Sequence, residues 1–217
     1  MIHQKRKDIL FFLIRKITVI NHLFRRYVCP WKDRGRGIHL NLGCGNQYNE
    51  YFVNVDANPQ KRLDLWLDVR NGLPFADKSV DSIYTAQMLE HLFPDELVRL
   101  LSDCRRALRD GGGMRIVVPN LKSAIIAYGQ RRSEWFSNWP RSYKSVGGRF
   151  SNFIFCDGQH RNAFDFDYMC EVLRDVGFSH IQECQPVQSR MYDSEVIRTY
   201  EQDEKQPMQL LYVEAFR

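Results

Sequence analysis

The sequence lacks several patterns that would place its 217 residues in a simple class. Its six cysteines include no C-x-x-C pair, so neither a cysteine-based zinc site nor a thioredoxin-like redox site is predicted. The longest apolar run near the N-terminus, residues 9–14, is far shorter than the roughly 20 residues that span a bilayer. No small-residue cleavage site follows that run, so a signal peptide is not expected. Scattered cysteines without a secretion signal predict a cytoplasmic protein.

Acidic residues are scarce in two segments. Residues 1–37 contain ten Lys and Arg against two Asp and Glu, and residues 121–163 contain seven against two. The rest of the chain is close to neutral or acidic. We therefore expect acidic partners for these two segments and not for the whole domain.

The basic N-terminal segment, residues 5–28, has the apolar spacing of a helix. One interpretation is a basic amphipathic helix that lies on an anionic membrane surface. The other is a helix that packs on the domain and covers the cofactor pocket, which is favoured because apolar stripes at helical spacing usually belong to the core. The predicted stripe consists of Ile9, Leu13, Ile17, Ile20, Phe24 and Val28.

The strongest local signal is the strand-like run 38–42, which ends in a glycine turn at Gly43 and Gly45. Glycines at such a turn let the backbone bend tightly and approach a ligand. A second strand follows at once and ends in Asp56, where an acid can accept both hydroxyls of a ribose. The alternative is that Asp56 caps the turn that follows. The G-x-G-x-x-G fingerprint of nicotinamide dinucleotide sites is missing, because Tyr48 stands at its last position.

Strands and helices alternate over the rest of the chain. This order favours an α/β fold with a parallel sheet. The predicted strands are 63–69, 80–85, 115–118, 179–184 and 210–216. The predicted helices are a short one over 86–92, one from Pro94 to the glycines 111–113, and one over 165–176. Residues 185–208 are predicted to be a long polar connector.

Residues 121–163 interleave aromatic and basic side chains. An insertion after a strand's carboxyl end, above a cofactor crevice, is well placed to recognise a substrate. Its aromatic rings could stack on sugars or bases, or they could form a small core of their own. We expect both interpretations to hold in part.

Several motifs occur together in one order: Leu42-Gly43-Cys44-Gly45, Asp56, Asp68, residues 73–75, residues 80–83, residues 88–92, residues 108–112 and residues 118–120. This series resembles the class I S-adenosylmethionine-dependent methyltransferase superfamily, of the type 11 kind. Within it, the chain is similar to predicted methyltransferases associated with bacterial surface-polysaccharide synthesis. The resemblance covers residues 38–120 and 157–217, and it leaves out the arm 1–37 and most of the cap insertion 121–163.

The resemblance implies a Rossmann-like, seven-stranded, mostly parallel sheet with an antiparallel last strand, 210–216, and helices on both faces. It also implies how S-adenosylmethionine would be held. Gln87 would lie near the methionine carboxylate or the acceptor, Asn41 replaces the acidic residue usual in the first motif, and a third glycine is missing. The other implied contacts are Leu42, Gly43, Cys44 and Gly45 beneath the methionine part, Asp56 at the ribose, and Ala57, Asp68 and Val69 around the adenine.

Methyl transfer from this cofactor is a displacement at carbon, so the protein's main task is to position the acceptor. His91 is the first candidate for a base that removes a hydroxyl proton, and His160 is the second. A purely structural role is an equal alternative for both. We predict O-methylation of a sugar, glycan or related small molecule. The alternatives are an RNA methyltransferase and a non-catalytic membrane-surface module that keeps the fold. No metal site is predicted.

Overall fold

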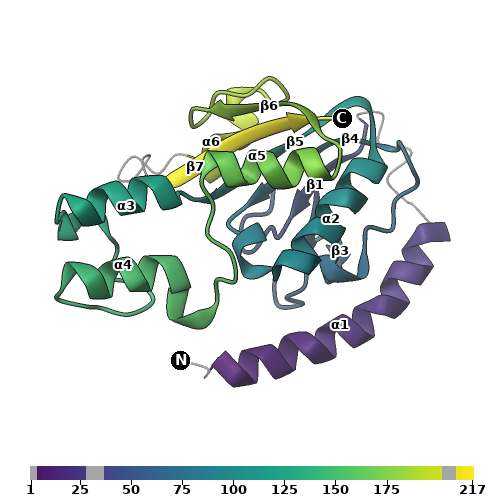
Figure 1. The fold of residues 1–217 in the computed structure, drawn as a ribbon. Helices are drawn as coiled ribbons and strands as arrows, with labels where there is room; N and C mark the ends of the chain where they lie inside the picture. The colour runs from purple at the N-terminus through teal and green to yellow at the C-terminus, as the bar shows by residue number, and fades with distance from the viewer. Residues whose placement is uncertain (1–3, 28–36, 202–208) are drawn as a thin grey trace.

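The protein is represented by a computed structural model that describes residues 4–27, 37–201 and 209–217. Seven strands form one sheet in the order β3-β2-β1-β4-β5-β7-β6 (Figure 1). The first five strands in that order are parallel, and β7 runs antiparallel to both of its neighbours. The predicted seven-stranded sheet is therefore confirmed. The strands are β1 His39–Leu42, β2 Val53–Asp56, β3 Leu65–Trp66, β4 Val80–Ala86, β5 Leu108–Pro119, β6 Ser179–Cys184 and β7 Leu210–Phe216.

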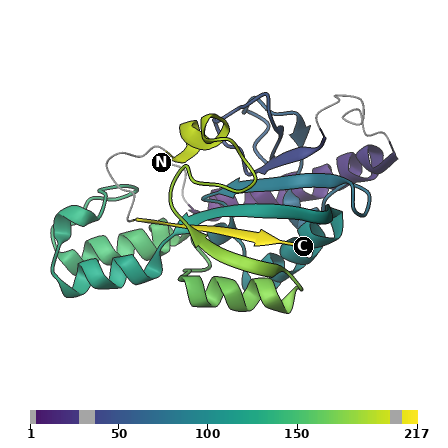
Figure 2. The ribbon, with the colours of Figure 1, turned by 90° about the horizontal axis from the view of Figure 1, so that it is seen from above.

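Helices lie on both faces of the sheet, and Figure 2 shows α6 on one side with α5 on the other. The α-helices are α1 Gln4–Tyr27, α2 Pro94–Ala107, α3 Leu121–Gly129, α4 Val146–Phe155, α5 Phe166–Asp175 and α6 Ser194–Glu201. Short 3-10 turns are η1 Val69–Asn71, η2 Leu89–His91, η3 Ser133–Trp135 and η4 Cys156–Gly158.

Alternation along the strands divides the core in two. In β5, Ile116 and Val118 face the helices α2 and α5, whereas Val117 faces α6. The larger core contains α2 and α5 side chains such as Leu101 and Leu173. The smaller core is mostly aromatic, and its buried members are Phe52, Tyr84, Val117, Tyr192, Ile197 and Tyr212.

Several predicted elements have different bounds in the structure. The strand predicted over 63–69 pairs only at Leu65–Trp66, at the edge of the sheet. The helix predicted over 86–92 is only the turn η2, because Gln87 has a left-handed φ of 51° and its amide pairs with β5. The helix that begins at Pro94 ends at Ala107, because Leu108 already pairs with Val80 of β4.

The prediction of a connector over residues 185–208 was wrong in part, since this segment contains α6. Helix α6 has one fully apolar anchor, Ile197, and its other buried side chain is Glu201. Both have the low exposure of core residues. The residues from 202 to 208 lie outside the described part of the chain.

Helix α1 packs on the domain, but not through its predicted apolar stripe. Ile14 and Thr18 are its buried side chains among residues 8–20. Asn71 of η1 donates to the Arg15 carbonyl and to Thr18 Oγ1, and Arg15 pairs with Glu96 of α2 at 3.3 Å. The stripe residues Ile9, Leu13, Ile17 and Ile20 are 52–65% exposed, so assigning them to the core was wrong. The side chain of Phe24, and Val28, lie outside the described residues.

The insertion 121–163 leaves and re-enters the domain at one place. Asn120, directly after β5, forms a parallel bridge with Phe164, and the Leu121 amide donates to the Phe164 carbonyl at 2.8 Å. Between these points, α3 and α4 pack around Ala124, Ala127 and Phe136 with several half-buried aromatic rings. The predicted small core of the insertion is therefore confirmed.

Candidate functional site

The glycine turn after β1 is fixed by hydrogen bonds to β2. The amides of Gly43 and Cys44 both donate to the Val55 carbonyl, at 2.8 and 3.1 Å. Gly43 has a φ of 74°, and a Cβ there would lie 2.6 Å from the Met88 side chain. Gly43 therefore has to be a glycine. A Cβ at Gly45 would meet no described atom within 4 Å, so the backbone here faces open space that a ligand can occupy.

Asp56, at the tip of β2, braces this turn. Its Oδ2 accepts from the Gly45 amide at 2.9 Å and its Oδ1 accepts from the Asn58 amide at 2.7 Å. The turn-capping role weighed for Asp56 is therefore present. A carboxylate has about four acceptor positions, so it can still accept hydrogen bonds from ribose hydroxyls. Beside it, the Ala57 carbonyl accepts from the Trp66 indole at 2.9 Å.

Asp68 lies at the end of the segment after β3, and its side chain is 3% exposed. Arg70 binds its carboxylate through two nitrogens, Nε at 2.9 Å and Nη2 at 2.6 Å. The Asp68 amide donates to Thr18 of α1, and Val69 begins η1 next to it. If Asp68 accepted a hydrogen bond from an adenine amino group, it would do so while its carboxylate remained bound to Arg70. Helix α1 thus lies against the segment predicted to hold the adenine.

Cys44 lies in the turn as a buried thiol. Burial, followed by the nearby charges of Asp56 and Asp64, raises the pKa of Cys44 to about 12. The thiol therefore stays protonated at neutral pH and is a poor nucleophile. Leu42, the residue before the turn, is fully buried in the core.

A cavity of about 190 Å³ opens where β4 and β5 end and the insertion begins. Gln87 and Pro119 form its sheet side, and its described lining contains no Lys or Arg. Gln87 thus joins the end of β4 to this cavity in a left-handed conformation, which is uncommon for residues other than glycine. The remaining lining comes from the insertion, from the first residue of β7 and from the residue before it: Ser137, Trp139, Asn152, Phe153, Cys156, His160, Leu210 and Gln209.

Of the two predicted histidines, His160 lines the cavity, and His91 lies beside it with a ring-centroid distance of 5.1 Å. His91 belongs to η2 and His160 follows η4, so two segments far apart in sequence are joined here. The backbone fixes that meeting, because the amides of Arg161 and Asn162 both donate to the Glu90 carbonyl, at 2.7 and 3.2 Å. Burial and the charge of His91 lower the pKa of His160 to about 4. His160 is therefore a neutral imidazole at pH 7.

Glu90, next to His91, was not predicted as a site residue. Its side chain is 1% exposed, and its Oε2 has no hydrogen-bond partner among the described residues. Burial raises the pKa of Glu90 to about 8. One ligand atom from each of Glu90, His91 and His160 lies within 4.8 Å of the others. The sequence analysis named His91 and His160 but not Glu90, whose closeness to His160 depends on the return of the chain through the insertion.

Helix α6 reaches the glycine turn through Tyr200, another residue that the sequence did not point to. The Asn41 amide donates to the Tyr200 hydroxyl at 3.4 Å, and that hydroxyl donates to the Gln47 carbonyl at 3.3 Å. Asn41, which stands where an acid is usual, is therefore bound to α6. Tyr200 in turn connects β1 to the loop after the glycines.

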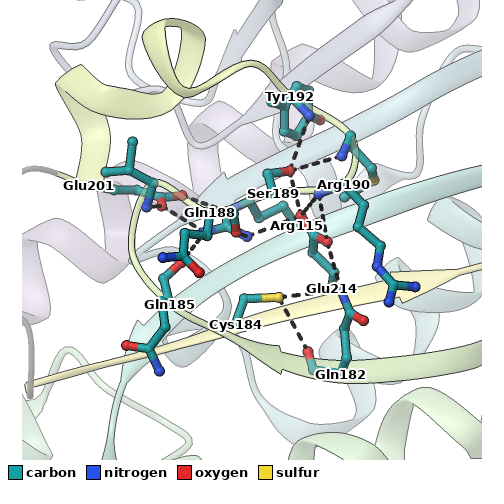
Figure 3. Close-up of polar contacts among 12 residues, drawn as sticks. Arg115, Gln182, Cys184, Gln185, Gln188, Ser189, Arg190, Tyr192, Glu201 and Glu214 are labelled. Carbon is teal, nitrogen blue, oxygen red and sulfur yellow. Dashed lines mark hydrogen bonds and ion pairs between the residues drawn. The ribbon is translucent and has the colours of Figure 1, made fainter.

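The position of α6 depends on a buried cluster around Arg115 of β5, shown in Figure 3. Arg115 has no exposed surface, and it pairs with Glu201 at 2.7 Å and with Glu214 at 3.0 Å. It also donates to the carbonyls of Gln185 and Gln188. Burial alone would lower the pKa of Arg115, but Glu201 and Glu214 outweigh it and raise the pKa above its usual value. This cluster ties the connector, α6 and β7 to the centre of the sheet.

Comparison with known proteins finds similarity to methyltransferases. The methyltransferase domain family matches residues 40–116. A probable S-adenosylmethionine-dependent methyltransferase of Mycolicibacterium smegmatis is 30% identical over 122 residues, which are 46% of this chain and 46% of that protein. The chain thus aligns with less than half the length of this curated relative.

Solved structures share the fold over nearly the whole chain. A methyltransferase of this cofactor class from Archaeoglobus fulgidus has a TM-score of 0.51 at 19% identity, covering 94% of each chain. Another from Thermotoga maritima has a TM-score of 0.52 at 13% identity, covering 97% of this chain and 95% of that one. The residues matched by the domain family include the glycine turn, Asp56 and Gln87. The open space beside Gly45 leaves room for a ligand. Residues 40–116 therefore match a methyltransferase domain, and the chain shares its overall fold with solved S-adenosylmethionine-dependent methyltransferases.

Proposed function

We propose that the protein transfers a methyl group from S-adenosylmethionine to a hydroxyl of a sugar, either free or at the end of a glycan. When bound, S-adenosylmethionine supplies a methyl group on a positively charged sulfur. Gly43, Gly45 and Asp56 would hold this cofactor at the carboxyl ends of β1 and β2. The chain's other tasks are to place the acceptor oxygen in line with the methyl group and to receive its proton.

The observation that carries the choice of acceptor is the lining of the 190 Å³ cavity. The lining includes the amide residues Gln87, Asn152 and Gln209 and the hydroxyl residue Ser137, together with the aromatic residues Trp139 and Phe153. Polar groups beside aromatic rings suit a ring that carries several hydroxyls. The cavity is smaller than the roughly 300–1,000 Å³ of drug-sized sites, which favours a single sugar unit.

The same lining speaks against RNA as the acceptor. Nucleic-acid sites neutralise phosphates with Lys and Arg. The described lining of the cavity contains neither residue type. Arg141, a basic residue of the insertion, is instead paired with Asp157 at 2.8 Å. His160, which lines the cavity, and His91, which contacts it, are the groups that we propose to act on the acceptor hydroxyl.

Replacing Trp139 with alanine tests the acceptor site. Trp139 is 66% exposed, so its removal should not disturb the core. We expect the KM for a sugar acceptor to rise by about tenfold or more, because a buried aromatic contact is worth about 1.5 kcal/mol or more. The KM for S-adenosylmethionine should not change. The measurement is the release of S-adenosylhomocysteine with a panel of monosaccharides, sugar nucleotides and short RNAs.

The matched control is Phe155→Ala. Phe155 is an aromatic of the same insertion that is 59% exposed and does not belong to the cavity lining. Its KM values should equal those of the wild type. Product formation with RNA but with no sugar would overturn the proposed acceptor class and favour the RNA alternative.

We also propose that α1 attaches the protein to an anionic membrane surface. No helix among the described residues is both long and apolar enough to cross a bilayer. Helix α1 nevertheless leaves an exposed apolar face, made of Ile9, Phe12, Leu13, Ile17 and Ile20. In the sequence, basic residues flank this face at 5–7 and at 25–26. An apolar face with basic residues at both ends fits a helix that lies in the interface of an anionic bilayer.

Leu13→Asp tests the membrane contact. Leu13 is 52% exposed on α1, so the fold should tolerate aspartate, while the charge should weaken binding to anionic vesicles by about tenfold or more. Co-sedimentation with phosphatidylserine vesicles and with neutral vesicles gives the measurement. Val98→Asp is the control, because Val98 is 44% exposed on α2, away from this face. Equal vesicle binding by the two variants would refute the proposal.

A further inference from the structure

Helix α1 contacts the segment expected to hold the adenine through one buried hydroxyl. Thr18 has no exposed surface, although most of the described residues around it on α1 are exposed. Its Oγ1 accepts from the Asp68 amide at 3.3 Å and from the Asn71 side-chain nitrogen at 3.0 Å. The same hydroxyl donates to the Arg15 carbonyl at 3.3 Å. A threonine hydroxyl has one donor and two acceptor positions, so all three are used here.

Ion pairs connect the same segments a second time. Arg70 binds the Asp68 carboxylate through Nη2 at 2.6 Å, and its Nη1 lies 3.7 Å from Glu96 of α2. Arg15 of α1 pairs with the same oxygen of Glu96 at 3.3 Å. The Asn71 side-chain nitrogen also donates to the Arg15 carbonyl, at 2.8 Å. These contacts form a closed ring from α1 through η1 and α2 back to α1.

The Thr18 hydroxyl is the acceptor for a backbone amide that is otherwise shut off from water. A buried amide without an acceptor is costly, so the path of the backbone at Asp68 depends on this hydroxyl. Asp68 also caps η1, because its Oδ1 accepts from the Arg70 amide at 3.0 Å. The direction of the Asp68 carboxylate follows from the backbone that carries it. A change at Thr18 would therefore be felt at that carboxylate.

We propose that Thr18 is a positioning residue of the cofactor site, which holds Asp68 where its carboxylate selects adenine over other bases. The inference rests on the proposed binding of S-adenosylmethionine, in which Asp68 and Val69 meet the adenine. Adenine has an amino group that can donate to the carboxylate. Hypoxanthine has a carbonyl oxygen in that place, and two acceptors cannot form a hydrogen bond. Helix α1 thus serves the cofactor through its buried side, whereas its exposed apolar face serves the proposed membrane contact.

Calorimetric titration of the full-length protein with two ligands tests this role. The ligands are S-adenosylhomocysteine and S-inosylhomocysteine, its analogue with hypoxanthine in place of adenine. The wild type should bind the adenine compound about tenfold or more tightly than the analogue, because only adenine donates to the carboxylate. Thr18→Val keeps the shape of the side chain but lacks the hydroxyl, so this preference should fall below about threefold. Thr18→Ser restores the hydroxyl and should restore the preference.

The control for a merely structural role is Ile14→Val. Ile14 is 6% exposed on the same side of α1, and the change removes a methyl group but no hydrogen bond. It should lower the melting temperature slightly and leave the preference for adenine unchanged. Asn71→Ala, at a partly buried position, gives a second result if Thr18→Val does not fold, because it removes the other donor to the Thr18 hydroxyl and should also reduce the preference.

The possible outcomes separate this inference from the proposed function. If Thr18→Val and Asn71→Ala keep the preference of the wild type, Thr18 does not position Asp68, while the cofactor assignment stands. Equal binding of the two ligands by the wild type would also overturn the inference, because Asp68 would then not select adenine. A wild type that binds neither ligand would overturn the proposed function, and the inference with it.

Discussion

Replacing Asp56 with alanine should weaken the binding of S-adenosylhomocysteine by about 100-fold. The variant would lose the acceptor for two ribose hydroxyls, and each charge-assisted hydrogen bond is worth about 1.5 kcal/mol or more. It would also release the Gly45 amide, which donates to Asp56 Oδ2 at 2.9 Å. Both losses act in the same direction. Calorimetric titration of the purified variant gives the dissociation constant.

Two further variants separate specific binding from a general change of the surface charge. Glu50→Ala removes a nearby acid whose side chain is 85% exposed and only 3.8 Å from Arg62, and it should bind like the wild type. Asp56→Asn keeps one oxygen for the Gly45 amide and should have an intermediate affinity. If Asp56→Ala binds within about threefold of the wild type, Asp56 does not hold the ribose.

Arg115→Leu should lower the stability of the protein more than any surface change. It would leave Glu201 and Glu214 buried without their partner, which typically costs about 3–5 kcal/mol. For a domain of this size the melting temperature should fall by roughly 6–20 °C. Thermal unfolding followed by circular dichroism measures this, and urea unfolding at constant temperature gives the free-energy change.

The control is an ion pair on the surface. Lys78→Ala breaks the Lys78–Asp110 pair, whose nitrogen–oxygen distance is 2.8 Å and whose side chains are more than half exposed, so it should leave the melting temperature nearly unchanged. Arg115→Lys keeps the charge but loses the two parallel bonds to Glu201, and it should be intermediate. Equal melting temperatures for Arg115→Leu and Lys78→Ala would contradict the role given to the buried cluster.

The sheet could be predicted from the sequence because its strands carry local signals. Strand β6 and strand β7 have the bounds that the apolar patterns predict, and β1 is one residue shorter. The glycine turn was equally plain, since Gly43 and Gly45 follow directly on an apolar run. Patterns of this kind depend on neighbouring residues alone, so a single sequence contains them.

Interactions between distant segments could not be predicted in this way. Arg115 reads as one polar residue in an apolar strand, and its partners Glu201 and Glu214 lie 86 and 99 positions further along. The surroundings of Glu90 likewise include a distant segment, because the amides of Arg161 and Asn162 donate to the Glu90 carbonyl. Such pairs leave no periodic signal.

Helix α1 shows a different reason for error. Its apolar spacing correctly predicted a helix. The side of the helix that packs on the domain, however, is a narrow strip that contains Ile14 and Thr18. Hydrogen bonds to Asn71 and an ion pair to Glu96 fix that side, so polar contacts decided the orientation of the helix. Periodicity identifies an apolar face but not what covers it.

The insertion that carries most of the acceptor cavity leaves and re-enters the domain where Asn120 and Phe164 pair, and it also contacts η2 through the amides of Arg161 and Asn162. Because its two ends already lie side by side, a longer or shorter excursion costs little additional loop-closure entropy. Residues 121–163 could therefore be exchanged as one unit while the strands β1 and β2, which we propose to hold the cofactor, stay unchanged. A change of acceptor would then require matching this junction and the contacts with η2, and no redesign of the sheet.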